Sequence, residues 1–176
     1  MDAEILKTAA SAPRLDKLKV RVDPAGRVVK QALYHHDANA IPQPVRELAA
    51  QEFPGSTPTR FETEYYAATG RAYEVEVKTQ PGRNCEVAAT AEGVKLYVEC
   101  HVDPSVLPPP VAETVRRVAA GAKIIEAEHT IYASGDEEFS IELETPQGEV
   151  YVQVRADGTL IGRYRVVPAM IEVPLP

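Results

Sequence analysis

The 176-residue chain contains no tryptophan and only two cysteines, and its ten glycines are outnumbered by fifteen prolines. Two cysteines are too few for the disulfide scaffold that holds many small secreted domains together. Apolar runs are short and broken by charges, so none approaches the roughly 18 to 20 residues that a membrane-spanning helix needs. The many prolines predict short elements rather than long helices.

The sequence also lacks an excess of basic residues. Its 19 lysines and arginines are scattered along the chain and face 26 aspartates and glutamates, which gives a net charge of -7. A phosphate backbone is bound by clustered positive charge, so we expect no nucleic-acid partner. Apolar residues make up 44% of the chain, which is enough to build a hydrophobic core.

The first thirteen residues do not form a secretory signal sequence. Asp2 and Glu4 stand where a basic segment would come first, and no long apolar segment follows. Two alternatives remain open, a cytoplasmic protein and a secreted protein without its leader.

Comparison of the chain with itself reveals a repeated pattern. The segment IPQPV at residues 41–45 recurs as LPPPV at residues 107–111, an offset of 66 residues. The same offset aligns Tyr66 with Tyr132 and residues 73–77 with residues 139–143. We interpret this pattern as two tandem repeats.

Each repeat contains signals for one helix followed by strands. Pro44 and Pro110 suit the first turn of a helix, where the missing amide hydrogen removes no helical bond. Apolar residues then recur at helical spacing, and the period changes to two in residues 73–77 and 139–143. Turn signals such as Glu92-Gly93 divide each repeat into four antiparallel strands.

Residues 41–167 resemble the PepSY-like family of beta-lactamase-inhibitor-like proteins. Pro-x-x-Val at the helix start, Phe53-Pro54-Gly55 at its end and the Glu92-Gly93 hairpin carry the resemblance, although the second copy has Ala119-Ala120-Gly121 at the helix end. The resemblance implies an extracytoplasmic bacterial protein, periplasmic or secreted, with a curved sheet and helices on one side. A cytoplasmic location is the alternative.

We therefore predict an α+β fold, in which an antiparallel curved sheet is built from two tandem helix-plus-four-strand PepSY-like repeats with the helices on one face. A hairpin around Ala25 and Gly26 supplies an N-terminal partial repeat. The predicted boundaries are residues 1–40 for the N-terminal segment and partial repeat, 41–106 for the first repeat, and 107–176 for the second repeat with its proline-rich tail.

The two cysteines are predicted to face each other across a hairpin. If Glu92 and Gly93 form a two-residue turn, the register places Cys85 directly opposite Cys100. A disulfide and a buried pair of thiols both remain open, because the sequence does not identify the compartment.

We find no catalytic or metal-binding motif. His35 and His36 are adjacent on an extended chain and point to opposite faces, while His101 and His129 occur singly in strands. No serine lies in a nucleophile elbow, and glycine-rich phosphate loops are absent. We expect no bound metal, no cofactor and no enzymatic activity.

Alternation along the strands indicates an acidic, tyrosine-rich sheet face opposite the helices. Its predicted members are Glu62, Glu64, Tyr66, Glu74, Glu76, Tyr97, Glu99, His101, Glu128, Tyr132, Glu142, Glu144 and Tyr151. Tyrosines provide rigid contact area and carboxylates attract a basic partner, so we predict a protein- or peptide-binding module of inhibitor-like type. A merely solvated sheet face is the alternative for these residues.

The alternative function is a structural or assembly role. Strand edges and chain ends recruit further strands, so the unfinished repeats at both ends of this chain would join neighbouring copies.

Overall fold

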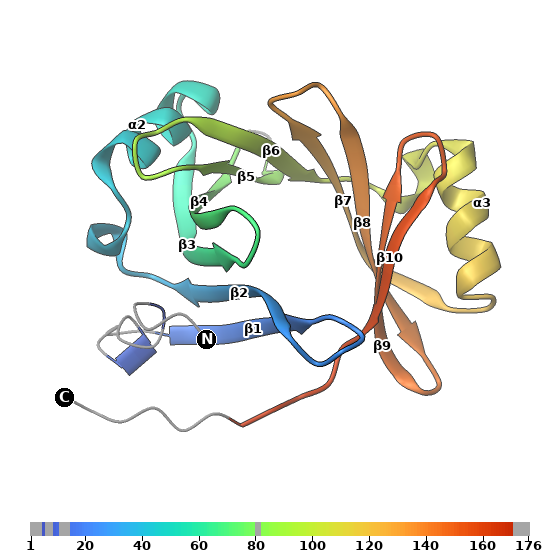
Figure 1. Ribbon diagram of the computed structural model, residues 1–176. Coiled ribbons are helices and arrows are strands. Elements are labelled where there is room, and N and C mark those ends of the chain that lie inside the picture. The colour runs from blue at the N-terminus through green and yellow to red at the C-terminus, as the bar shows by residue number, and fades with distance from the viewer. Residues whose placement is uncertain (1–4, 6–8, 11–14, 80–81, 171–176) are drawn as a thin grey trace. The chain divides into compact units, whose positions relative to one another are not determined.

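The computed structural model describes residues 5, 9–10, 15–79 and 82–170 (Figure 1). Ten strands form one sheet and hydrogen-bond in the order in which they follow one another in the sequence. They are β1 (Leu15–Val22), β2 (Val28–His35), β3 (Thr57–Tyr66), β4 (Gly70–Lys78), β5 (Asn84–Ala89), β6 (Lys95–His101), β7 (Lys123–Tyr132), β8 (Glu137–Thr145), β9 (Gly148–Arg155) and β10 (Leu160–Arg165). The predicted antiparallel sheet is confirmed.

Two α-helices interrupt the succession of strands. They are α2 (Gln43–Glu52) and α3 (Pro109–Val118), and a short 3-10 turn precedes each of them, η1 (Ala38–Ala40) and η2 (Pro104–Val106). Both helices begin within one residue of the predicted prolines, since proline stands in the first turn of each. Each is followed by a glycine with positive φ, at Gly55 (77°) and Gly121 (76°), where other residues are strained.

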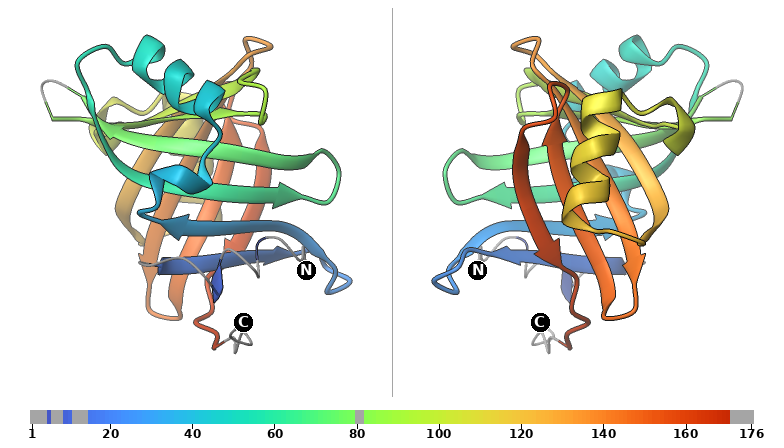
Figure 2. Two further views of the ribbon diagram at one scale, coloured as in Figure 1. Left: turned by 90° about the vertical axis from the view of Figure 1, so that its left-hand side faces the viewer. Right: turned by 90° about the vertical axis from the view of Figure 1, so that its right-hand side faces the viewer.

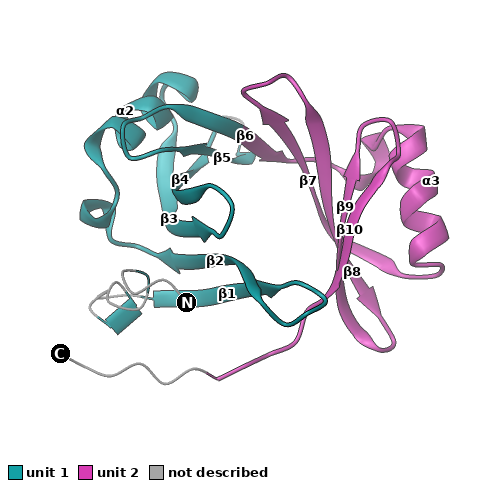
Figure 3. Cartoon of the chain, in the orientation of Figure 1, with its two compact units in different colours: residues 1–97, 171–176 teal, residues 98–170 magenta. Residues whose placement is uncertain are grey.

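The chain divides into two compact units (Figure 3). Unit 1 comprises residues 1–97 with 171–176, and unit 2 comprises residues 98–170. The boundary falls within β6, so Tyr97 belongs to unit 1 whereas His101 belongs to unit 2. The proline-rich tail at residues 173–176 lies outside the described residues.

The predicted fold class is wrong in its organisation. We predicted two helix-plus-four-strand repeats after a partial repeat, whereas the strands among the described residues form one ten-stranded sheet, with α2 and α3 between them. The physical reason is that backbone pairing continues from strand to strand. β1 and β2 are complete eight-residue strands, and β2 pairs with β3 along its length, so the N-terminal hairpin extends this sheet. The predicted boundaries at residues 40 and 106 stay a prediction.

In unit 2, α3 packs against the sheet, where it lies beside β9 (Figure 2, right). Val111 and Val115 of the helix join a buried cluster with alternate residues of β8, Phe139, Ile141 and Leu143. β9 adds a further row of alternate valines to this cluster. Because side chains alternate along a strand, Ser140 and Glu142 lie on the opposite face.

In unit 1, α2 contacts β4 and β5 (Figure 2, left). Its buried residues are Val45 and Ala49, and the strands contribute alternate buried valines, Val75 and Val77 among them. Glu74 therefore lies on the face away from α2.

Two hairpin glycines explain the Asp/Glu-Gly signals of the sequence. Gly93 has a φ of 82° and Gly158 one of 89°. A Cβ at either position would lie 2.9 Å from the Cβ of a helix proline, Pro44 for Gly93 and Pro110 for Gly158. Each turn thus needs glycine both for its conformation and for its approach to a helix.

Candidate functional site

The predicted binding-face residues differ widely in exposure. Glu62, Glu64, Glu74 and Tyr151 are buried, Glu144 is exposed, and Tyr66, Glu76, Tyr97, Glu99, His101, Glu128, Tyr132 and Glu142 are half-buried. The expectation of an open acidic face therefore fails for the three buried glutamates of unit 1. Alternation identifies the face of a side chain but not whether that face is solvated.

The centre of the unit 1 cluster is Glu64 of β3, whose side chain is fully buried. Its carboxylate forms an ion pair with Lys30 of β2 and accepts a 2.8 Å hydrogen bond from the hydroxyl of Tyr66. The Lys30 ammonium also lies 4.9 Å from the centre of the Tyr66 ring. These contacts compensate for the loss of water around a buried charge.

The Tyr97 hydroxyl also connects strands that are not neighbours in the sheet. The Tyr97 hydroxyl of β6 donates a hydrogen bond to Glu74 of β4 and lies 3.5 Å from Oε2 of Glu64. Tyr97 thus contacts two buried glutamates on different strands. Burial, reinforced by the charge of Glu64, raises the pKa of the Tyr97 phenol well above its usual range, so the group remains a donor.

A second cation, Arg60 of β3, forms ion pairs with two other glutamates of the cluster. Arg60 Nη2 lies 2.6 Å from Glu76 Oε2 and 3.8 Å from Glu62 Oε1. The same guanidinium lies 4.9 Å from the centre of the Tyr34 ring. Because the cation favours Glu76 in distance, it compensates Glu62 only in part.

The buried carboxyl groups bind protons more tightly than usual. Burial, with the neighbouring charge of Glu64, raises the pKa of Glu62 to about 8. Burial likewise raises the pKa of Glu74 well above its ordinary value, and the Glu64 and Glu86 charges add to this. The cluster thus holds Glu62 mainly in its neutral form at pH 7.

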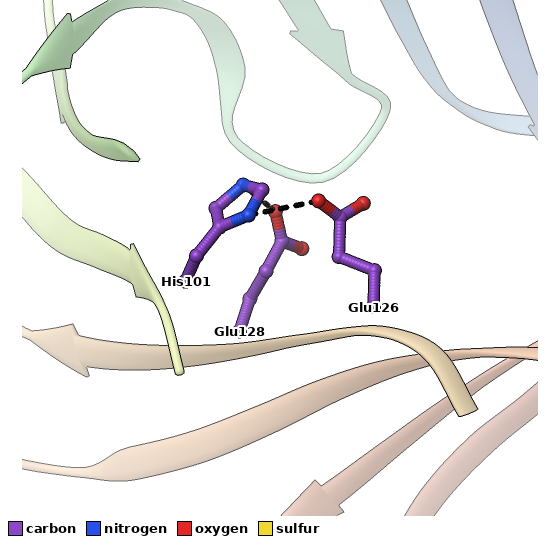
Figure 4. A group of neighbouring side chains, drawn as sticks. All are labelled: His101, Glu126 and Glu128. Atoms are coloured by element: carbon purple, nitrogen blue, oxygen red, sulfur yellow. Dashed lines mark ion pairs between the residues drawn. The ribbon is translucent and has the colours of Figure 1, made fainter. Parts of the chain in front are cut away.

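In unit 2, two adjacent strands bring together an imidazole and two carboxylates (Figure 4). His101 Nδ1 of β6 lies 2.8 Å from Glu126 Oε1, and its Nε2 lies 3.3 Å from Glu128 Oε1, both glutamates belonging to β7. All three side chains are partly solvent-accessible. Hydrogen bonds that the His101 ring donates to the two glutamates raise the pKa of His101 to about 10, so the metal-free protein carries an imidazolium here at neutral pH.

Other residues of the same face are held by local hydrogen bonds. The Tyr132 hydroxyl donates to Glu138 Oε2 at 2.8 Å, and the Tyr151 hydroxyl donates to Ser140 Oγ at 2.7 Å. Thr130 donates to Glu99. Tyr132 remains half-exposed, whereas Tyr151 is buried.

Neither cysteine is a free thiol. Cys85 and Cys100 are both disulfide-bonded, which agrees with one of the two alternatives open from the sequence. Their state in the isolated protein stays a prediction.

The sequence pattern did not reveal that Lys30, Arg60 and Glu126 contact these glutamates and His101. Glu126 is two residues from Glu128, so strict alternation could have found it on the same face. Lys30 and Arg60 had no such signal, because a lysine or arginine in a strand is usually a solvated residue.

No helix among the described residues is long and apolar enough to cross a membrane. No protein-family model and no curated protein matches the sequence.

Several solved structures with a similar fold come from Bacteroides. A BLIP-like protein from Bacteroides fragilis is 18% identical with a TM-score of 0.54, and the match covers 76% of this chain and 95% of that one. A DUF2874 family protein from Bacteroides ovatus is 12% identical with a TM-score of 0.55, covering 73% and 89%. A protein from Bacteroides eggerthii, described as a candidate periplasmic protein, is 11% identical with a TM-score of 0.56, covering 70% and 88%. The protein has a BLIP-like fold.

Proposed function

We propose that the protein is a non-enzymatic binding module that contacts a basic protein or peptide through one sheet face of unit 2. The observation that carries this proposal is the partial exposure of carboxylates and a tyrosine on the face opposite the α3 core. This acidic face of unit 2 comprises His101, Glu128, Tyr132, Glu142 and Glu144. Carboxylates attract basic partners over a distance, and a half-exposed tyrosine gives rigid contact area.

The buried members of the predicted face have a different part in this proposal. Glu62, Glu64 and Glu74 lie inside unit 1, where solvent and a partner do not reach them without rearrangement. We therefore assign them a structural role, in which they bind Lys30 and the tyrosine hydroxyls.

An extracytoplasmic location belongs to the same proposal. The Bacteroides eggerthii protein of similar fold is described as a candidate periplasmic protein. Disulfide-bonded cysteines fit an oxidising compartment. We also propose that the protein is related to the PepSY-like family, because Phe53-Pro54-Gly55 at the end of α2 resembles the motif of that family.

The test begins with selection of peptides from a random display library on the immobilised protein. The affinity of a selected peptide is then measured by fluorescence anisotropy for the wild type and for the double variant E142K/E144K. We expect charge reversal to weaken binding by about tenfold and to flatten its salt dependence.

The matched control is R116E, a charge reversal at an exposed position of α3. It should leave the affinity unchanged, because α3 packs on the other side of the sheet. Equal affinities for the wild type and E142K/E144K would exclude the acidic face as the binding surface.

The fold similarity also motivates a test of inhibition. The Bacteroides fragilis structure is described as a BLIP-like protein, and the sequence motifs resemble those of beta-lactamase-inhibitor-like proteins. An inhibitor-like role predicts that the wild-type protein slows hydrolysis by a purified beta-lactamase and that E142K/E144K slows it less. Unchanged hydrolysis at saturating protein argues for a different partner.

A structural or assembly role remains the second candidate, favoured by the edges of the sheet. β1 and β10 end the strand order, and Leu160 and Ile161 of β10 are 40% and 41% exposed. Edge strands with exposed apolar residues recruit further strands. Light scattering across a concentration series tests this candidate, since assembly predicts a mass that grows with concentration. The terminal residues 1–4 and 171–176 lie outside the described residues.

A further inference from the structure

The His101 cluster of unit 2 has the composition and spacing of a metal-ligand set. One imidazole nitrogen and two carboxylate oxygens, from His101, Glu126 and Glu128, all lie within 4.8 Å of one another. Ligands on a tetrahedral zinc ion lie about 3.4 Å apart, as follows from bonds of about 2.1 Å. The observed contacts, 2.8 Å from His101 Nδ1 to Glu126 and 3.3 Å from Nε2 to Glu128, are both shorter than that value. They reach the two different nitrogens of the ring, of which one would bind the ion.

The backbone explains why these side chains converge. The Val102 amide donates to the Ala127 carbonyl at 2.8 Å, which places the end of β6 beside the β7 segment that carries both glutamates. Glu126 and Glu128 are two residues apart and therefore share a face. A register shift occurs between Ile124 and Glu126, so the bulged Ile125 changes the direction of the strand just before the first glutamate.

A further carboxylate lies next to this group. Glu142 of β8 is directly opposite Glu126 in the antiparallel register. Like charges directly opposite each other destabilise a sheet, and a divalent cation would offset that repulsion.

A second cluster of carboxylates among the described residues is less suited to bind a metal ion. Glu62, Glu64 and Glu74 also place oxygens within 4.8 Å of one another, but all three are buried. The Lys30 ammonium already forms an ion pair with Glu64. That group offers neither an imidazole nor access for a hydrated ion, whereas the His101 cluster offers both.

We propose that His101, Glu126 and Glu128 form a binding site for a divalent transition-metal ion, with zinc as the preferred occupant. Imidazole nitrogen favours zinc and its neighbours over calcium and magnesium, which prefer all-oxygen sites. Three protein ligands on a partly exposed face leave a position for water or for a group from a partner. The site does not depend on the proposed binding function.

The test uses zinc chloride and the metal-free, disulfide-intact protein in isothermal titration calorimetry. We expect one equivalent of zinc to bind. H101Q and E128Q should each weaken binding by at least about tenfold, because each removes a ligand. Excess calcium or magnesium should not displace the zinc.

H129Q is the matched control. His129 Nε2 also pairs with a glutamate in unit 2, at 2.7 Å from Glu137 Oε2, but among the described residues it forms an ion pair with this one carboxylate, and its ring stacks on Phe139. Zinc affinity should be unchanged in H129Q. Circular dichroism checks that each variant folds. If H101Q does not fold, the zinc affinity of E128Q alone tests the proposal.

The NMR signals of the His101 ring provide a second readout in the wild type. Zinc should shift them and leave those of His129 in place. The proposal is overturned if the wild type binds no zinc, if H101Q and E128Q bind it as tightly as the wild type, or if the His101 signals do not respond.

Discussion

Among single residues, Glu62 links the buried cluster of unit 1 to pH. Its pKa of about 8 in the folded protein lies above the ordinary glutamate value of 4.5, because burial and the Glu64 charge disfavour the ionised form. The folded state therefore holds this proton more tightly than the unfolded state. Stability from this group is fully present below pH 4.5 and is lost as the pH rises through about 8.

We accordingly predict that the free energy of unfolding of the wild type falls between pH 5 and 8, by up to about 1.4 kcal/mol per pH unit for this one proton. E62Q mimics the neutral carboxyl and should have a shallower slope. A slope remains because Glu74, whose pKa is also raised, contributes with the same sign. Urea unfolding at several pH values measures it, with the exposed E144Q as control. An unchanged slope in E62Q would contradict the account of Glu62.

Tyr97 and Tyr132 allow a second comparison between residues. Y97F removes the hydroxyl that donates to buried Glu74, so that a buried carboxyl loses a partner. We expect a loss of about 1 to 3 kcal/mol in the free energy of unfolding. Y132F removes a bond to Glu138 that water can replace, and should cost less than about 1 kcal/mol. Guanidinium unfolding of both variants checks the prediction, which fails if the two losses are equal.

Among the elements, the β9–β10 turn contacts α3, and a substitution in the turn tests how much this contact stabilises unit 2. The Thr114 hydroxyl of α3 donates to the Gly158 carbonyl at 2.7 Å, and Pro110 occupies the space where a Cβ would stand. G158A should therefore disturb both the turn and the start of the helix.

G135A is the matched control, since Gly135 has the same φ of 89° and nothing within 4 Å of its Cβ position. Both alanines adopt an unfavourable backbone conformation, which costs about 1 to 2 kcal/mol. G158A should cost at least about 1 kcal/mol more, because it also overlaps Pro110. Thermal unfolding followed by circular dichroism measures the difference, and equal melting temperatures would show that the turn moves away from the helix freely.

For the whole molecule, the disulfide is the covalent constraint on the chain. A bond between Cys85 and Cys100 closes a loop of about 15 residues, for which loop entropy gives about 3 kcal/mol. We expect no titratable thiol in the denatured, unreduced protein and two after reduction. Reduction should lower the free energy of unfolding by about 2 to 4 kcal/mol. Two thiols before reduction would show that the isolated protein contains a dithiol.

The sequence by itself determined the local features of this protein. Prolines mark the start of α2 and α3, positive-φ glycines end them, and period-two alternation locates the strands, because each signal acts within a few residues. Only the tertiary structure decided that the strands form one continuous sheet, since backbone pairing depends on which strand edges come together in space.

The tertiary structure also decided which acidic residues are buried. In the sequence, Glu64 looks like a solvated strand residue. The structure shows that it is buried and forms an ion pair with Lys30 of another strand. His101 likewise reads as a lone histidine until β7 places Glu126 and Glu128 beside it. Alternation assigns a side chain to a face, whereas burial and charge depend on contacts between residues distant in the chain.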